Sequence, residues 1–521
     1  MVHIEANTGH PRRWAILAVM VVSLLAVVLD NTVLNVAMKT LADPVHGLGA
    51  TQSELEWAIN AYTLAFAGLL FTFGVLGDRW GRKRMLMTGL VLFGLTSLLS
   101  AYSQDPGQLI AARAFMGLGG AAITPVTLSI ISDVFDPRER GRAIGIWTAS
   151  VGLAIVIGPL LGGFLLEHFW WGSVFLINVP VLLAGLIAVA LLVPESRDPR
   201  PGQVDLVGVV LSVAGLVCLT YGIVNGGAHG FDRVRVWAFI VAGIGILAVF
   251  LWWERHTEHP SLDLKLFRSA PFSASITSIA LVFFASVGPL FFISFYLQLV
   301  RGFSPMAAGA LMMPFAVGQM VFSPLSTTLV NRFGVRLVSV FGILVAAAAV
   351  GHIVSWNAGT PVWMILTVSF VMGAGLATVT PPAMNTIVGT LPRERAGVGS
   401  AIANTIRQVA GALGIAVIGS VVAGVYRNGM TETTSTLPSE LRDRAAESVA
   451  GAHGVADRLG PAGTALAEAA NDAFIQALHW AAITSVSFNL LAMFVALIWL
   501  PRNVFTPPPT PSSPRELVTS R

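Results

Sequence analysis

The sequence has 521 residues, of which 55% are hydrophobic and 11% charged, with a formal net charge of +4. Soluble domains are about 45–50% apolar and about 25% charged, so this composition excludes an ordinary soluble domain and a disordered chain. The single cysteine, Cys218, excludes an intramolecular disulfide. The small positive charge fits basic loops beside a membrane better than a nucleic-acid partner.

Fourteen long hydrophobic runs follow one another, separated by short loops that carry proline, glycine and charge. A membrane-spanning helix takes about 20 residues, whereas strands of a membrane barrel are about 10 residues long and alternate in hydrophobicity. The runs therefore predict an all-α integral membrane protein. The first run lacks a small-residue cleavage site, which indicates a retained span and not a signal peptide. The predicted helices cover residues 14–37, 57–76, 85–103, 108–131, 143–166, 174–193, 206–224, 236–253, 272–299, 306–330, 336–355, 361–384, 398–425 and 473–500.

The basic residues predict how these helices are oriented. With the N-terminus in the cytoplasm, 21 of the 31 Lys and Arg residues fall on the cytoplasmic side, so both termini are expected there. Residues 426–471 predict a long, partly helical outer loop, which either gates the outer mouth or is a solvated cap without a direct role. The proline-rich segment 506–521 predicts a disordered tail.

The chain also resembles itself. Three motifs recur in the same order at offsets of 256, 255 and 253 residues: 116–119 at 372–375, 137–140 at 392–395 and, more faintly, 76–81 at 329–334. We interpret this repeat as two six-helix bundles, residues 1–195 and 271–505, with a two-helix insertion at 196–270 between them. Parallel repeats of this kind are a transporter architecture with a central site between the halves.

Two charged residues within the spans are the first candidates for function. Asp30 lies near the outer end of the first span, and an acid inside an apolar run suggests a functional site. Arg113 lies inside the fourth span, where a permanently charged guanidinium needs a partner or an aqueous cavity. The alternatives are a boundary acid that faces water and an arginine that binds backbone carbonyls.

Two glycine-rich motifs predict segments that take part in conformational change. The cytoplasmic loop between the second and third spans predicts a charge latch, with a basic topology anchor as the alternative; its residues are Gly74, Gly77, Asp78, Arg79, Gly81 and Arg82. A small-residue stripe in the fifth span predicts close helix packing, with a kink at the proline. Its residues are Gly145, Gly158, Pro159, Gly162 and Gly163.

A third set of residues could line a substrate cavity. It comprises Asn35, Phe292, Tyr296, Arg407 and Gln408. The two aromatic residues could stack on a lipophilic cation, and core packing is the alternative for them. The sequence has no Walker loop, metal-ligand cluster or nucleophile motif, so we expect neither an enzyme nor a cofactor.

At these residues the chain resembles the major facilitator superfamily, specifically its fourteen-helix drug:proton antiporters. The motifs that carry the resemblance are residues 30–37, 74–84, 109–121, 145–163 and 171–180. The resemblance implies proton coupling through Asp30 and Arg113, a latch at Asp78 and Arg82, and a gating role for the helix with Gly158-Pro159.

The chain departs from the family pattern at a few positions. Ala154 and Met116 stand where the family often has Gly and Gln, and Met38-Lys39 replaces a usual Leu-Pro. The tenth span also has no carboxylate, unlike some relatives that handle divalent organic cations.

These observations predict a proton-driven exporter of hydrophobic, often cationic drugs that works by alternating access in a bacterial inner membrane. Its partners would be small substrates, protons and lipids, and the protein would be a monomer. The alternatives are a dedicated exporter or importer of one metabolite or lipid and, from another class, a non-transporting receptor or scaffold.

Overall fold

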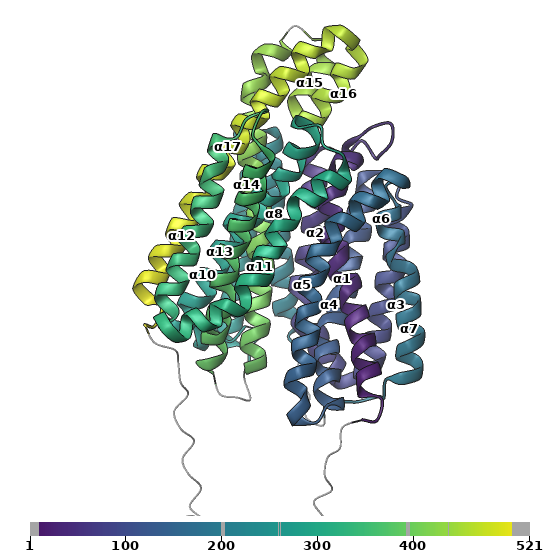
Figure 1. The fold of residues 1–521 in the computed structure, drawn as a ribbon, viewed down its shortest axis with the longest axis vertical. Coiled ribbons are helices and arrows are strands. Elements are labelled where there is room, and N and C mark those ends of the chain that lie inside the picture. Colours follow the sequence, from purple (N-terminus) through teal and green to yellow (C-terminus); the bar gives the residue numbers. More distant parts are fainter. Residues whose placement is uncertain are drawn as a thin grey trace, which may run out of the picture.

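The computed structural model describes residues 10–198, 204–258, 260, 262–391, 396–435 and 437–502. The regular elements of this part of the chain are all helices (Figure 1). The predicted tail at 506–521 and the repeat motif at 392–395 lie outside the described residues.

The first seven helices pack on one another and are called the N-bundle (Figure 1, purple to blue). They are α1 (Arg13–Ala42), α2 (Gln52–Trp80), α3 (Arg82–Ala101), α4 (Pro106–Val134), α5 (Pro137–His168), α6 (Ser173–Leu176) and α7 (Asn178–Leu192).

A second group of helices is called the C-bundle. It consists of α10 (Ala270–Phe295) with its continuation η2 (Tyr296–Val300), α11 (Pro305–Phe333), α12 (Val335–His352) with η3 (Ile353–Ser355), α13 (Val362–Gly389), α14 (Ala396–Thr434) and α17 (Thr464–Trp499). The short helix η1 (Leu264–Arg268) precedes α10.

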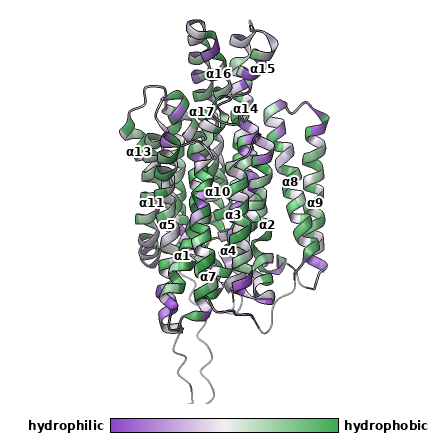
Figure 2. Cartoon of the chain, turned by 90° about the vertical axis from the view of Figure 1, so that its right-hand side faces the viewer, coloured by the Kyte–Doolittle hydropathy of each residue, from purple (hydrophilic) through white to green (hydrophobic). Residues whose placement is uncertain are grey.

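Helices α8 (Leu206–His229) and α9 (Val234–His256) form a pair beside the two bundles (Figure 2). α8 packs against both α2 and α14, so it covers the seam where these helices of the two bundles meet. α9 presents large exposed apolar side chains such as Val241, Ile244 and Trp252, which suits a face turned to lipid.

One end of the molecule carries a small helical cap (Figure 1). It is formed by α15 (Ser439–Glu447), α16 (Val449–Leu459) and η5 (Gly460–Gly463). We call this side the cap end, and the side where α1 begins and α17 ends the termini end. The predicted loop at 426–471 is therefore more helical than expected, because α14 and α17 continue beyond their apolar runs. Buried residues of α16, such as Val449 and Val455, belong to the same hydrophobic cluster as Leu466 of α17.

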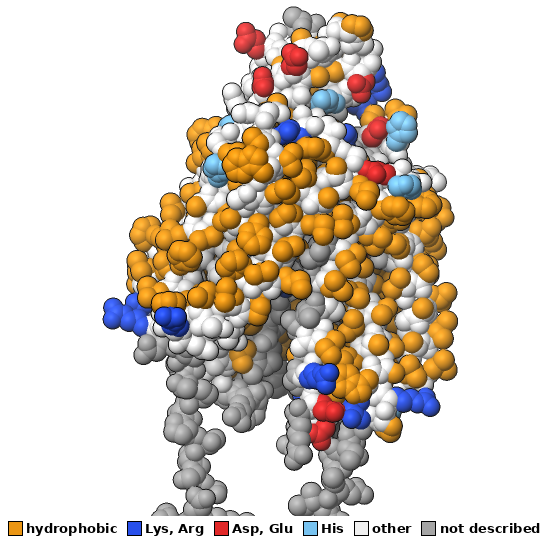
Figure 3. All heavy atoms as spheres, viewed as in Figure 1, with side chains coloured by type: hydrophobic (Ala, Val, Ile, Leu, Met, Phe, Trp, Pro, Cys, Tyr) orange, Lys and Arg blue, Asp and Glu red, His pale blue; other side chains and the backbone are white. Residues whose placement is uncertain are grey.

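Thirteen helical segments in the described residues are long and apolar enough to cross a membrane, and each overlaps one predicted span. The remaining predicted span, 143–166, lies within the continuous helix α5. Hydrophobic side chains cover the middle of the molecule, whereas charged side chains gather toward its two ends (Figure 3). The chain is therefore a multi-pass membrane protein, as predicted.

Local signals explain where several helices begin. α2 starts with a capping box, in which the Thr51 hydroxyl accepts from the Glu54 amide at 3.2 Å and the Glu54 carboxylate accepts from the Thr51 amide at 2.9 Å. α4 and α11 begin with Pro106 and Pro305, each after a side-chain cap. The capping box starts α2 five residues before the predicted span at 57, which brings Glu56 into the helix.

Candidate functional site

Asp30 of α1 and Arg113 of α4 form an ion pair inside the N-bundle. Arg113 Nη1 donates to Asp30 Oδ2, and the two residues are 0% and 2% exposed. α1 continues to Ala42, twelve residues beyond Asp30. Asp30 therefore lies in the middle part of its helix, and the expectation that it lies near the outer end is wrong. The apolar run ends before the helix does, because the last turns of α1 pack against protein.

Arg113 also contacts α2. Its Nε donates to the backbone oxygen of Ala58 at 3.1 Å, and its guanidinium lies 4.4 Å from the ring centroid of Tyr62. The arginine therefore binds a backbone carbonyl and a carboxylate at once, and joins α1, α2 and α4. Arg113 Nη2 is buried and has no hydrogen-bond partner among the described residues, so the site has spare capacity for a polar contact.

Two residues that the sequence analysis did not assign complete this site. Asn178 Nδ2 donates to Asp30 Oδ1 at 3.3 Å and to Ser97 Oγ at 3.3 Å, and Ser97 in turn donates to Phe175 O at 2.8 Å. α6 ends at Leu176 and α7 begins at Asn178, with Pro180 in its first turn, where a missing N–H is tolerated. The Asn-x-Pro signal in an apolar run could have located this break.

The predicted latch residues lie together at the termini end. Arg82 Nε donates to Asp78 Oδ1 at 2.9 Å, and Arg82 also pairs with Asp133 of α4. Gly81 has a φ of +118°, and a Cβ there would come within 2.7 Å of Glu195 Cδ, so only glycine fits. In this conformation the two ion pairs of Arg82 join α3 to α2 and α4, all within the N-bundle. Asp133 and Glu195 were not predicted.

The other glycines of this loop differ in how closely they pack. A Cβ on Gly77 would come within 2.8 Å of Val126 of α4, whereas one on Gly74 would stay 3.6 Å from Pro125. Gly77 therefore allows α2 to approach α4 closely, and Gly74 is less restricted.

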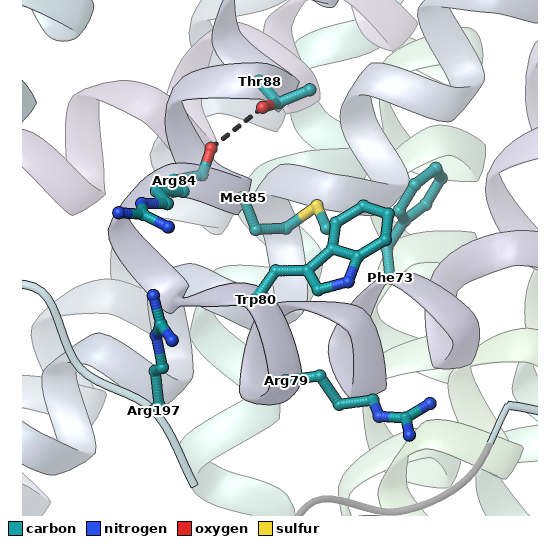
Figure 4. Close-up of a pocket in the computed structure, with 7 residues that line it drawn as sticks. All are labelled: Phe73, Arg79, Trp80, Arg84, Met85, Thr88 and Arg197. Carbon is teal, nitrogen blue, oxygen red and sulfur yellow. Dashed lines mark hydrogen bonds between the residues drawn. The ribbon is translucent and has the colours of Figure 1, made fainter.

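Arg79 lies near a surface pocket at the termini end (Figure 4). The pocket has a volume of about 420 Å³ and is lined by Phe73, Arg79, Trp80, Arg84, Met85, Thr88 and Arg197. Trp80 is 61% exposed. This pocket is formed by the end of α2, the start of α3 and Arg197, and it is separate from the Asp30–Arg113 site.

The predicted glycine stripe of α5 touches both bundles. Gly158 and Gly162 face Thr32 and Val33 of α1, where an added Cβ would come within 2.7 and 2.9 Å of side-chain carbons. Gly163 faces Met306 of α11 in the C-bundle, with 2.7 Å between an added Cβ and the Met306 nitrogen. The expectation of close packing is wrong for Gly145, which is exposed, and none of the described atoms lies within 4 Å of an added Cβ.

Pro159 faces the same neighbour as Gly163. Its carbonyl carbon would lie 2.7 Å from a Cβ placed on Gly309 of α11. α5 therefore connects the surroundings of Asp30 with the C-bundle.

Hydrogen bonds between the two bundles lie at the cap end of the described residues. Ser294 Oγ donates to Asn35 O at 2.7 Å, Gln298 Nε2 to Val36 O at 3.0 Å, and Lys39 Nζ to Gln298 O at 2.9 Å. The cap end is therefore closed in this conformation. Lys39 and Gln298 were not predicted as bridging residues, since their partners are backbone oxygens.

The predicted cavity residues fall into two groups. Phe292 and Tyr296 are buried, and the Tyr296 hydroxyl donates to Asn357 O at 2.7 Å, so both are core residues in this conformation. Arg407 lies with its guanidinium 5.2 Å from the Phe283 ring centroid, and its buried Nε has no hydrogen-bond partner within residues 10–198, 204–258, 260, 262–391, 396–435 and 437–502. Gln408 and Asn35 are half-buried.

The major facilitator superfamily model matches residues 20–415. The chain is 35% identical to the multidrug efflux pump LfrA of Mycolicibacterium smegmatis, over 93% of this chain and 95% of the relative. It is 32% identical to the tetracenomycin C resistance and export protein of Streptomyces glaucescens, covering 95% and 93% of the two chains. It is also 32% identical to the methyl viologen resistance protein SmvA of Salmonella typhimurium, covering 93% and 98%.

Solved structures agree with the fold. A bacterial homologue of the human lysosomal transporter Spinster, in an inward-facing and unoccupied conformation, matches with a TM-score of 0.65 at 17% identity, covering 94% of this chain and 98% of that chain. The matching span, the relatives and the fold together establish that this chain is a member of the major facilitator superfamily of membrane transporters, and not an enzyme.

Proposed function

We propose that the chain is a proton-driven exporter of small hydrophobic, often cationic compounds, including drugs. The observation that carries this proposal is the buried Asp30–Arg113 pair, a carboxylate and a guanidinium held together within the membrane-spanning part of the N-bundle. Intramembrane charges of this kind are costly and mark ion pathways. Relatives named as efflux or export proteins, which match more than nine-tenths of the chain, support the direction of transport.

The proposed machinery is alternating access between two rigid halves. Residues 1–195 and 271–505 would be the moving bundles, with 196–270 as an inserted pair, and the cap end would face outward. Both termini would then lie in the cytoplasm of a bacterial cell, with the protein in its inner membrane. We propose that it works as a monomer without a cofactor, using the proton gradient.

The packing around Asp30 suggests how a proton could move the bundles. Protonation of Asp30 would remove its charge and weaken the attraction to Arg113, while Asn178 could still bond to the neutral acid. Thr32 and Val33 of α1 contact Gly158 and Gly162 of α5. A shift of α1 would therefore be passed to α5, and from α5 to α11 in the C-bundle.

Transport by the purified protein in proteoliposomes tests this function. With an imposed proton gradient, we expect uphill transport of several lipophilic cations from a compound panel, and loss of that transport in Asp30→Asn. Glu468→Gln, which changes an exposed acid of α17, is the matched control. Unchanged uphill transport in Asp30→Asn would contradict the assignment, and transport of a single compound would favour a dedicated exporter.

A further inference from the structure

A second carboxyl group, Glu56, is buried outside the site described above. It lies on α2 near the cap end and is 2% exposed. Its Oε1 accepts from Gln52 Nε2 at 3.1 Å, one turn away on the same helix. None of the ion pairs in the described part of the chain involves Glu56. Its burial is thus balanced by a neutral amide and by no cation.

Glu56 lies at the seam between the two bundles. Its carboxyl packs against Gly419 of α14, where an added Cβ would come within 2.6 Å of Glu56 Oε2. α8 closes the seam next to it, because Ser420 Oγ donates to Ile223 O of α8 at 2.8 Å. The carboxyl of one bundle therefore fits a notch that a glycine leaves in the other.

Glu56 belongs to a polar column that ends in an unsatisfied residue. Gln52, Glu56 and Asn60 are four residues apart and share one face of α2. Both side-chain polar atoms of Asn60 are buried, and neither has a hydrogen-bond partner in the part of the chain that the structure describes. Leu64, one turn further, packs with Leu216 of α8 and Ala412 of α14, which places this face in the seam.

The charged groups around this end of the seam do not neutralise Glu56. Arg427 of α14 donates to Gly227 O at 2.7 Å and to Ala228 O. Glu447 of the cap is half-buried, and burial together with the charge of Glu54 raises its pKa. This end of the seam thus holds Glu54, Glu56 and Glu447, while the charges of Arg427 and Arg444 act on Glu447.

We propose that Glu56 is a second protonation site, separate from the Asp30–Arg113 pair, which must carry a proton for the bundles to close at the cap end. An isolated carboxylate is strongly disfavoured in a buried site, whereas a carboxylic acid is tolerated. Opening at the cap end would separate α2 from α14 and expose Glu56 to water, where it ionises. The closed form therefore binds this proton more tightly, so low pH on that side favours closure.

Because this inference rests on the proposed alternating access, its test uses neither substrate nor gradient. Spin labels on Gln104→Cys and Val362→Cys, in a Cys218→Ala background, report the distance across the cap end by pulsed electron paramagnetic resonance in lipid nanodiscs. For the labelled parent protein, in which Glu56 is unchanged, we expect the closed population to fall as pH rises from 5 to 9. The equilibrium constant between the closed and open forms should change by up to about tenfold per pH unit.

The variants separate Glu56 from other acids. Glu56→Gln should remain closed throughout and lose most of the pH dependence, Glu56→Asp should keep it, and Glu468→Gln should behave like the parent. Glu56→Met serves if the glutamine variant does not fold. A full pH response in Glu56→Gln, or no response in the parent, would overturn the inference. If the parent protein shows the pH-dependent closure but no transport in proteoliposomes, the result would instead count against the proposed function.

Discussion

Arg113 holds three helices through chemically different contacts. Its carboxylate partner lies on α1, its carbonyl partner and its aromatic partner lie on α2, and the arginine itself lies on α4. A guanidinium can do this because its donors point in several fixed directions and its faces can stack on a ring. An ammonium group has no equivalent geometry, so lysine is not a conservative replacement here.

Removal of one partner of this pair should be more damaging than removal of both. In Arg113→Gln the Asp30 carboxylate stays buried without its cation, at a cost of up to about 3–5 kcal/mol. Asp30→Asn combined with Arg113→Gln leaves two neutral amides and should recover part of the lost thermal stability in detergent. If the double variant is no more stable than Arg113→Gln, the pair is not the source of the loss.

At the scale of one helix, α5 is built to touch two neighbours along its length. Gly158 and Gly162 allow α1 to approach, and Gly163 allows α11 to approach from the other bundle. Small residues permit this backbone contact in a membrane, where apolar side chains gain little by packing on each other instead of on lipid. α5 remains one continuous helix from Pro137 to His168, although Pro159 lies inside it.

A single methyl group should disturb this contact. Gly158→Ala would bring a Cβ to 2.7 Å from Thr32 Cβ, and such overpacking typically costs about 1–3 kcal/mol. We expect a lower melting temperature and impaired transport. Gly245→Ala in α9 is the matched control, since an added Cβ meets nothing within 4 Å and alanine favours the helix by about 1 kcal/mol. Equal effects of the two substitutions would show that the close approach is unimportant.

At the scale of the whole molecule, the bundles are joined at the cap end by bonds to backbone atoms. The described residues form four such hydrogen bonds, one of them from the Met306 amide to Glu167 Oε1 at 3.2 Å. Bonds of this kind form only when the helices of the two bundles are aligned along their axes so that donor and acceptor meet. If the cap end opens as proposed, these bonds would break, and within the described part of the chain no ion pair between the bundles would have to break with them.

A cross-link at the cap end should trap the closed conformation. With Glu167→Cys and Met306→Cys in a Cys218→Ala background, a short cleavable bifunctional thiol reagent should abolish transport, and reduction should restore it. Each single-cysteine variant treated in the same way is the control. Full transport by the cross-linked protein would mean that the bundles do not separate at the cap end during the cycle.

The membrane spans could be predicted from the sequence because hydropathy is a local property. A run of about 20 apolar residues predicts a spanning helix whatever lies beside it. The same reasoning placed the ends of α1 and α14 too early and the start of α2 too late. These helices continue beyond their apolar runs as polar or amphipathic segments that pack against protein. The hidden start of α2 is also why Glu56 escaped notice, although the Thr51–Glu54 capping box was present in the sequence.

The sequence by itself determined that this protein crosses the membrane many times, and it identified Asp30 and Arg113 as charged residues within the spans. Only the tertiary structure decided how those residues meet. Asn178 reaches Asp30 across 148 residues, and Glu56 meets Gly419 of the other bundle. Such contacts depend on how whole helices pack, and they decide whether a buried charge has a partner. Hydropathy and motif spacing report which segments enter the membrane, whereas packing alone determines which of the buried charged groups are neutralised.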